Sequence, residues 1–336
     1  EREGAARYAA RFRVPADLAA GTYELWVHNG YGGRWGFGEP LSVPVENREP
    51  WPEVVYEVTA FGAVGDGEAD DTQAFRAALA QAAAQGGGVV HVARGTYKIT
   101  GKLTVPPRTV LRGEKREWVW LYAPVNQPEF DAVIAGNGDF AVEELSIVSQ
   151  TARRLVACPD HLATYAGPSG NVPPEEEMGR NVRLSRLRLH HLRYAHRVAA
   201  SDPRRLEGAG PTTVFLAGPD MVLEDSEIIS SGKAFLLANS RRCRVEGNRL
   251  ETGRNGGYIF ASVQESVFAD NDIRAADLEG TYGGTSGTSY RLHIADNYWH
   301  DAYGQEREAL TFDTPYFHVW RGRVGRVDGR RFTTAA

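Results

Sequence analysis

A repeated asparagine position constrains the fold of this chain more than any other feature. When the segments DMVLEDSEIISS, RRCRVEGNRLET, ESVFADNDIRAA and RLHIADNYWHDA are aligned, Ser226, Asn248, Asn271 and Asn297 share one column. Successive members of the column are 22, 23 and 26 residues apart. A steady period in this range predicts a solenoid in which each repeat forms one coil. Asparagine suits the bend of a coil because its side chain can hydrogen-bond backbone groups there.

Each repeat contains a second strand ahead of this column, in TTVFLAG, KAFLLAN, GYIFASV and GTSGTS. The earlier segments DFAVEELSIVSQ and NVRLSRLRLHHL fit the strand pattern as well. Stacking the second strands predicts an inward column of Leu216, Ala238, Ala261 and Gly287, with Leu236 and Ile259 also inward. Alternation then predicts that the following side chains point outward: Phe215, Phe235, Leu237, Tyr258, Phe260 and Ser262.

YEVTAF predicts a strand, and the overlapping stretch Ala60–Ile99, AFGAVGDGEADDTQAFRAALAQAAAQGGGVVHVARGTYKI, then predicts a turn at its start, a helix and a returning strand. Asp70 or Asp71 is expected to cap the helix, which ends at Gly86. Asp66, Glu68, Asp70 and Asp71 could also supply oxygen ligands to calcium. Their spacing does not match an EF-hand loop, and a helix N-terminus favours acidic residues through its dipole. We therefore interpret the acidic cluster as structural.

FGAVGDGEADDTQAFRAAL followed by GGGVVHVARGTY resembles the N-terminal signature of the pectate-lyase-like superfamily of right-handed parallel β-helix proteins. The resemblance implies that the helix caps the N-terminal end of the solenoid. GRNGG, GTYGG and REALTFD are similar to motifs of a group of bacterial multidomain β-helix proteins presumed to act on carbohydrates. This second resemblance places Arg254, Asn255, Glu308 and Asp313 in matching motifs, and it implies further domains beyond this chain.

The first fifty residues differ from the rest. Alternation from Arg11 to Val45 predicts three or four short strands, which are too few for an independent sandwich. We expect a partial immunoglobulin-like module or an appendage, joined to the solenoid by PVENREPWPEV with its three prolines. The expected domains are a small β segment over 1–50 and an all-β, right-handed parallel β-helix with an N-terminal capping helix over 51–336.

Composition excludes several classes of partner. The net charge of −5, without long single-sign runs, argues against nucleic acid, and no apolar run is long enough to span a bilayer. Two cysteines, Cys158 and Cys243, do not indicate a disulfide framework. We expect a monomer without a metal or cofactor. We expect no signal peptide in the first residues, because they lack an apolar core. An extracellular or periplasmic location is expected by analogy with polymer-degrading β-helix proteins.

The segment WHDAYGQEREALTFDTPYFHVW holds the densest mixture of acids and bases. Phe312 is assigned to the inward column with Ala261, so Thr311 and Asp313 are expected to face outward beside the stacked aromatic side chains. Those rings suit a sugar face, unless the long stretch from Asp160 to Pro211 covers them. The predicted catalytic residues are Asp313, Glu308, Asp301 and His300. The predicted substrate-binding residues are Arg254, Asn255, Tyr258, Phe260, Phe235, Lys233, Arg307 and Tyr303.

Three functions remain open. The first is an inverting glycoside hydrolase, in which two carboxyl groups ~6.5–9.5 Å apart act as acid and base. The combined set of Asn-Thr-Asp, Asp-Asp, Gly-His-Gly and Arg-Ile-Lys signatures that marks polygalacturonases is not found in the sequence, which argues against pectin hydrolysis. The second is a lyase that cleaves a uronate polymer by β-elimination, with Lys233, Arg254 or His300 as base and with calcium as a cofactor. The third is a non-catalytic glycan-binding solenoid.

Overall fold

A computed structural model gives the fold. It describes residues 2–6, 9–12, 15, 17–28, 30, 32–45, 50–125, 127–162, 177–192, 212–252, 257–260, 263–275, 283–285, 290–295, 298–300, 310–312, 316–320 and 323–324. The chain divides into two compact units, Glu1–Pro50 and Trp51–Ala336. No helix among the described residues is long and apolar enough to cross a membrane.

The first unit consists of two antiparallel strand pairs and one short helix. β1 (Arg2–Ala6) pairs with β2 (Ala9–Phe12), and β3 (Gly21–Leu25) pairs with β4 (Leu41–Val45), with the 3-10 helix η1 (Gly33–Gly36) between them. β1 lies before the segment in which strands were expected. Of the residues in this unit whose burial is described, only Gly36 is buried, so the unit shows little core of its own.

The second unit is built from three parallel sheets, and from β7 to β30 each coil contributes one strand to each sheet in turn. The first sheet contains β5 (Val55–Glu57), β7 (Gly88–Val92), β10 (Thr109–Gly113), β13 (Phe140–Glu143), β16 (Val182–Ser185), β19 (Met221–Glu224), β22 (Arg244–Glu246), β25 (Val267–Ala269), β28 (Tyr290–Ala295) and β31 (Tyr316–Trp320).

The second and third sheets run alongside it. The second sheet contains β6 (Asp66–Asp70), β8 (Gly95–Lys98), β11 (Val119–Ala123), β14 (Ser146–Ser149), β17 (Arg188–His191), β20 (Glu227–Ser230), β23 (Arg249–Thr252), β26 (Asp272–Ala275), β29 (Tyr298–His300) and β32 (Arg323–Val324). The third sheet contains β9 (Leu103–Thr104), β12 (Phe130–Ala135), β15 (Ala152–Cys158), β18 (Thr212–Ala217), β21 (Lys233–Ala238), β24 (Gly257–Phe260), β27 (Gly283–Thr285) and β30 (Leu310–Phe312).

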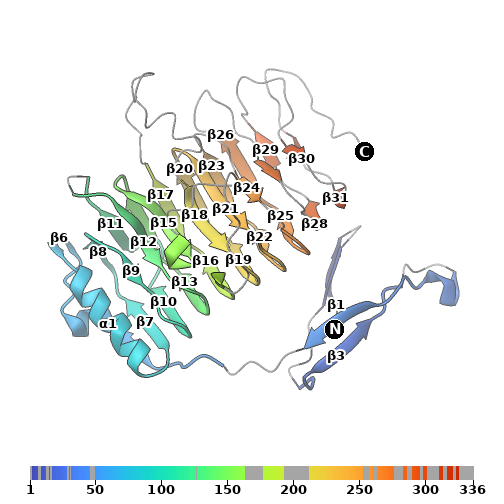
Figure 1. Cartoon of the computed structure of the whole chain (residues 1–336), viewed down its shortest axis with the longest axis horizontal. Helices are drawn as coiled ribbons and strands as arrows, with labels where there is room; N and C mark the ends of the chain where they lie inside the picture. Colours follow the sequence, from blue (N-terminus) through green and yellow to red (C-terminus); the bar gives the residue numbers. More distant parts are fainter. Residues whose placement is uncertain are drawn as a thin grey trace. The chain divides into compact units, whose positions relative to one another are not determined.

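These stacked strands confirm the predicted solenoid and are consistent with a right-handed parallel β-helix (Figure 1). The helix α1 (Thr72–Ala84) lies at the end formed by the first strands, where it contacts β5, β7 and β9. Its apolar face is buried, and the ring of Phe75 meets that of Tyr97 edge to face with centroids 5.3 Å apart. The helix therefore covers the open end of the core, as the sequence indicated.

The start of this unit departs from the prediction in two places. YEVTAF was expected to be one strand, but β5 ends at Glu57 and Val58–Phe61 form the 3-10 helix η2. The acidic stretch was expected to be a turn, yet Asp66–Asp70 form the edge strand β6, which pairs with β8. A register shift within β6, at a left-handed Gly67, explains why the sequence does not read as a strand.

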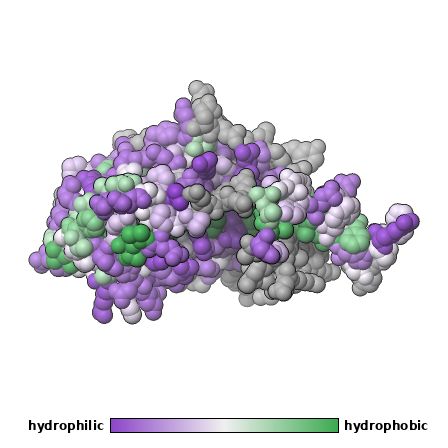
Figure 2. All heavy atoms as spheres, turned by 90° about the horizontal axis from the view of Figure 1, so that it is seen from below, coloured by the Kyte–Doolittle hydropathy of each residue, from purple (hydrophilic) through white to green (hydrophobic). Residues whose placement is uncertain are grey.

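The outer face of the first sheet carries paired charges. Glu224 accepts from Arg183 at 2.6 Å and from Arg244 at 2.7 Å, and Glu143 accepts from Arg112 at 2.5 Å. Figure 2, a view from below, shows that the described surface on that side is predominantly hydrophilic. The arginines of these pairs are exposed, whereas Glu143 and Glu224 are mostly covered. Ion pairs open to solvent on one side keep the face solvated, and pairs at a protein surface contribute about 0–1 kcal/mol each.

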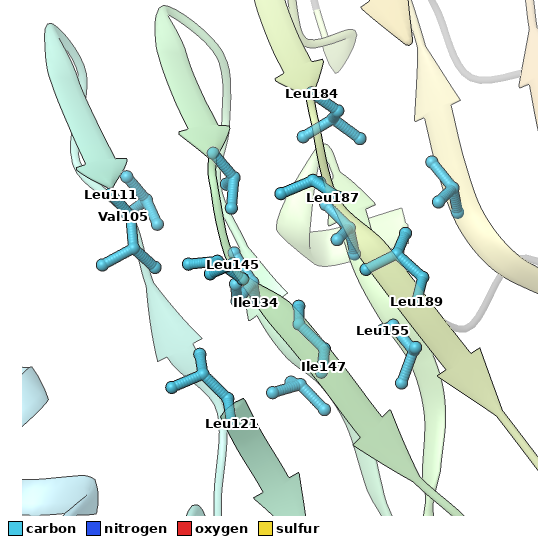
Figure 3. Close-up of a cluster of buried hydrophobic side chains, with 14 of the residues drawn as sticks. Val105, Leu111, Leu121, Ile134, Leu145, Ile147, Leu155, Leu184, Leu187 and Leu189 are labelled. Carbon is cyan, nitrogen blue, oxygen red and sulfur yellow. The ribbon is translucent and has the colours of Figure 1, made fainter. Parts of the chain in front are cut away.

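The interior is a continuous apolar core to which all three sheets contribute. Leu111 of β10, Leu121 of β11 and Ile134 of β12 are fully buried, and Figure 3 shows such side chains pointing into the same space. Burying a leucine or isoleucine stabilises the fold by about 1.5–3 kcal/mol. Stacking one such layer per coil makes each repeat depend on its neighbours.

The predicted asparagine column is confirmed as a hydrogen-bonded ladder. The Oδ1 atom of Asn248 accepts the backbone N–H of Ser226 at 3.0 Å, and its Nδ2 donates to a carbonyl of the preceding coil. Asn271 accepts the N–H of Asn248 at 3.0 Å in the same way. The fourth member, Asn297, lies outside the described residues. The ladder satisfies buried backbone groups at the bend between the first and second sheets.

At the bend between the first and second sheets, one residue in each of five coils has a left-handed backbone conformation. The φ angle of these residues lies between 50° and 66°, and they are Glu144, Arg186, Asp225, Gly247 and Asp270. Only Gly247 lacks a Cβ, and a Cβ added there would approach Oδ1 of Asp225 at 2.8 Å. The five bends therefore share one backbone geometry, and four of them have a polar or charged residue at the left-handed position.

Candidate functional site

Seven of the predicted catalytic and substrate-binding residues lie outside the described residues. They are Asp313, Glu308, Asp301, Arg307, Tyr303, Arg254 and Asn255. For His300, Tyr258 and Phe260 the structure gives the backbone register only. Phe235 and Lys233 are described in full.

His300 lies in a different sheet from the predicted groove. It belongs to β29 of the second sheet and pairs with Arg274, whereas the predicted aromatic face belongs to the third sheet. Tyr258 and Phe260 do lie in the third sheet, where they pair with Leu236 and Ala238. Tyr258 and Phe260 therefore lie in the sheet of the predicted groove, whereas His300 does not.

The predicted orientation of β21 is wrong by one residue. Phe235 and Leu237 were expected to point outward, but both belong to the main core, and the ring of Phe235 lies 5.8 Å from that of Phe268. Leu236, expected inward, packs with Phe215 in a separate cluster on the other side of the sheet. Phe235 is thus a core residue and not a substrate-binding one.

The error arises because strict alternation fails in this sheet. Ala234 and Phe235 both face the core, as do Leu155 and Val156 of β15, two coils earlier in the stack. A strand in which two successive residues point inward carries a local irregularity that period-two counting does not reveal.

The inward column shifts accordingly. Leu216 pairs with Leu237, Leu237 with Ile259, and Ile259 with Thr285, in place of the expected Ala238, Ala261 and Gly287. Thr285 pairs with Phe312, so Phe312 shares the register position of Ile259 and not that of Ala261. The register position one residue earlier is taken by Phe215, Leu236, Tyr258, Gly284 and Thr311 in successive coils.

The stacked aromatic surface expected to bind a sugar is not open to solvent at Phe215. Its ring faces outward, as predicted, yet only 1% of the residue is exposed. Met178, from the long stretch between Asp160 and Pro211, packs against its cluster. This part of the outer face is therefore covered, which was the alternative to a sugar-stacking surface.

Two cations lie on the same face, and sequence reasoning found only one of them. Lys233 is 4% exposed and Arg154 is 6% exposed, and the Arg154 guanidinium carbon lies 4.5 Å from the centre of the Phe215 ring. The pKa of Arg154 is lowered to about 9, chiefly by burial and in part by the nearby charge of Arg153, against the raising effect of Asp131. The signal in the sequence was a charged residue inside the apolar strand ARRLVAC, which the repeat alignment did not include.

The carboxylates of the N-terminal acidic cluster accept hydrogen bonds from nearby backbone N–H groups. Asp66 accepts the N–H groups of Glu68 and Ala69 at 2.8 and 2.9 Å, and these bonds, that from Ala69 above all, lower its pKa. Asp71 accepts the N–H of Val64 at 2.7 Å. Throughout the part of the chain that the structure describes, no three His, Cys, Asp or Glu side chains gather as a metal site would require.

Asp70 anchors the start of α1. Its carboxylate accepts the N–H of Thr72 at 3.1 Å and the hydroxyl of Thr100 at 2.6 Å. Burial raises the pKa of Asp70, but the hydrogen bonds from Thr100 and Thr72 outweigh burial, so that its pKa is lowered overall. The favoured structural interpretation of the cluster agrees with these contacts.

The buried thiols are not a reactive site. Cys158 and Cys243 are both free and buried, and burial raises both pKa values, that of Cys243 to about 11. A thiol protonated at neutral pH is a poor nucleophile. Both side chains belong to the core cluster.

Residues 55–138 match the family described as "Rhamnogalacturonase A/epimerase, pectate lyase-like". The resemblance to pectate-lyase-like β-helix proteins is confirmed for this part of the chain. Over 46 residues the sequence is 50% identical to mannuronan C5-epimerase AlgE5 and 48% identical to alginate lyase 7, both of Azotobacter vinelandii. Each match covers 14% of this chain and 5% of the relative, so the chain spans only a small part of these relatives.

Two solved structures are similar in fold. The Agl-KA catalytic domain superposes with a TM-score of 0.50 at 13% identity, over 85% of this chain and 57% of that one. The exopolygalacturonase of Thermotoga maritima gives a TM-score of 0.46 at 14% identity, over 85% and 79%. At this identity the likeness concerns the fold, and the matched proteins include an epimerase, a lyase and an exopolygalacturonase.

Proposed function

We propose that this protein binds a polysaccharide along the outer face of the third sheet and cleaves it as an inverting glycoside hydrolase. The observation that carries the proposal is the register of β30. Its Thr311 shares a register position with Tyr258 and Gly284 of the two preceding coils, and in the sequence Glu308 precedes this strand while Asp313 follows it. The family match at residues 55–138 supports a carbohydrate substrate.

The proposed chemistry requires two carboxyl groups. A protonated one donates its proton to the glycosidic oxygen as the bond from that oxygen to the anomeric carbon breaks. An ionised one takes a proton from water, whose oxygen attacks the anomeric carbon from the opposite face. We assign these roles to Asp313 and Glu308. Asp301 remains a candidate partner for either, whereas the strand of His300 lies in the second sheet.

The remaining predicted residues would serve binding. Arg254, Asn255, Arg307 and Tyr303 are proposed to contact hydroxyl or carboxylate groups of the sugar, and Tyr258 and Phe260 to contact its rings. Tyr258 and Phe260 lie two coils before β30 in the same sheet. We further propose that the protein works as a monomer. We also propose that it acts outside the cytoplasm, because a large polysaccharide would be located there.

A second candidate is β-elimination or epimerisation of a uronate. The short matches to mannuronan C5-epimerase and alginate lyase favour it. Both reactions remove the proton alpha to the uronate carboxylate, and elimination also expels the glycosidic oxygen and leaves a conjugated double bond. That double bond gives a lyase an ultraviolet signature that a hydrolase lacks.

The test is an incubation with a panel of neutral and uronic-acid polysaccharides, with and without chelator. New reducing ends and absorbance near 235 nm are followed together, for the wild type and for Asp313→Asn and Glu308→Gln. Glu251→Gln is the matched control, because Glu251 is a carboxylate on the second sheet that pairs with Arg249.

Reducing ends without absorbance, reduced by about 100-fold or more in both acidic variants and unchanged in the control, would support hydrolysis. Absorbance that rises with product would replace hydrolysis by β-elimination. Binding of a glycan without any cleavage would make the protein a glycan-binding solenoid, and the proposed reaction would be wrong.

A further inference from the structure

One register position of the third sheet can be followed through successive coils from β12 to β30. Ala135, Ala157, Phe215 and Leu236 occupy it in the first four of these coils. Tyr258, Gly284 and Thr311 occupy it in the next three. This register row therefore connects β30, the strand next to which we place catalysis, with four coils whose side chains the structure describes.

The first four members of the row lie on the side of the sheet that faces away from the main core. Ala157 lies between two core residues, Val156 and Cys158, yet it belongs to a separate cluster with Ala135. Strand neighbours on either side of it thus point the opposite way. The two members that follow belong to another cluster on that outer side.

These four side chains are out of reach of a ligand. Ala135 and Ala157 are 0% exposed, and Phe215 and Leu236 are 1% exposed. Outward residues of an open groove would be accessible to a sugar ring, and these are as inaccessible as the core. A polysaccharide therefore cannot lie directly on the sheet in any of these four coils.

Met178 closes the covered region nearest to the proposed catalytic strand. It packs against the cluster that contains Phe215 and Leu236. The next residue, Gly179, lies so close to β15 that a Cβ added to it would clash with Sγ of Cys158. Packing this tight leaves the segment little space into which to move aside.

We propose that Met178 and the covered coils behind it form a wall that closes one end of the polysaccharide site, so that the enzyme cleaves close to a chain end. The inference rests on the proposed function, because it concerns how the same polysaccharide binds on the same sheet. Met178 is then a residue that determines the mode of cleavage without touching the reacting bond.

The length of the site follows from the stack. β24 and β27 lie between β21, which carries Leu236, and β30. Neighbouring strands are about 4.8 Å apart, so the wall and the catalytic strand are separated by about 14 Å, enough for about three sugar residues. A chain that runs along the row from β30 towards β21 must end at the wall, and cleavage beside β30 then releases a short product.

The test follows viscosity and product length together. Polygalacturonate, alginate and xylan are each incubated with the wild type, and products of every polymer that is cleaved are separated by chromatography. Products of about one to three sugar residues should appear from the first time point. Viscosity should fall slowly for each new chain end, because the long chains persist.

Met178→Ala removes the side chain that closes the site. A chain should then extend beyond the wall, so that products longer than about four residues appear and viscosity falls faster for each new chain end. Met178→Leu should keep the short products, because an apolar side chain of similar volume remains.

Ile229→Ala is the matched control, because it truncates a partly buried apolar residue on β20 of the second sheet. Its products should have the length of the wild-type products. Thermal unfolding of each variant shows whether it folds. If Met178→Ala does not fold, Leu236→Ala opens the same wall from the side of the sheet and decides the question.

Long products from the wild type at the first time point would overturn the inference and leave the proposed function standing. Short products that stay unchanged in the folded wall variants would overturn it as well, because the wall would not set their length. If none of the three polymers is cleaved, the proposed function and the inference both fail.

Discussion

At the scale of single residues, the solenoid depends on polar side chains that satisfy backbone groups. Asn248 is 1% exposed, and it bonds a backbone N–H and a carbonyl of the preceding coil. Asp70 bonds the first turn of α1 and Thr100. In both cases a short side chain replaces water at a place where the backbone leaves its regular ladder.

Asn248→Ala should destabilise the protein by about 2–4 kcal/mol, because the N–H of Ser226 and the partner carbonyl lose their hydrogen bonds while buried. The measurement is the free energy of unfolding from urea titration. Glu246→Gln, on the outer face of the same coil, should cost about 0.5 kcal/mol or less. A loss in Asn248→Ala as small as that of the control would contradict the ladder's role.

Asp70→Asn should change how stability depends on pH. The pKa of Asp70 is lowered in the folded state, so its carboxylate stabilises the protein above its unfolded pKa of about 3.9. That contribution is lost as pH falls through the lower folded pKa. The stability difference between wild type and variant should be largest near neutral pH and shrink in acid, whereas Gln81→Ala, which removes an exposed side chain that does not titrate, should show no such trend. A difference that is constant across pH would rule out this account.

At the scale of elements, the helix and the third sheet show what periodicity can and cannot predict. The alanine-rich segment was predicted as a capping helix, and α1 ends within two residues of the predicted Gly86. In the third sheet, alternation failed at Ala234 and Phe235, because two successive side chains face the core. A helix carries its own hydrogen bonds, whereas the irregularity in a strand is set by the neighbouring coils.

Phe75→Ala in α1 should destabilise the β-helix by about 3–5 kcal/mol, since the ring is fully buried against Tyr97 at the capped end. Gln81→Ala, on the exposed face of the same helix, should change the unfolding free energy by about 0.5 kcal/mol or less. Urea midpoints with an unchanged slope would measure both. Similar midpoints for the two variants would mean that α1 does not support the core.

At the scale of the whole molecule, the sequence predicted the architecture better than the site. The period of the Asn248 and Asn271 column was visible because every coil must solve the same backbone problem at its bend. The cation Arg154 was missed because its coil has a long insertion after it and did not align with the others. Which residues share one face depends on the register between coils, and no single repeat encodes that register.

A blocking substitution tests whether a polysaccharide is processed on the third sheet, as we propose. Gly284 shares a register position with Tyr258 and Thr311 in that sheet, and Gly284→Trp would place a large ring there. Ile229→Trp, on the second sheet, is the control. We predict that Gly284→Trp lowers kcat/KM for the cleaved glycan by about 100-fold or more, while Ile229→Trp leaves it within about threefold. Equal activity of the two folded variants would contradict the account.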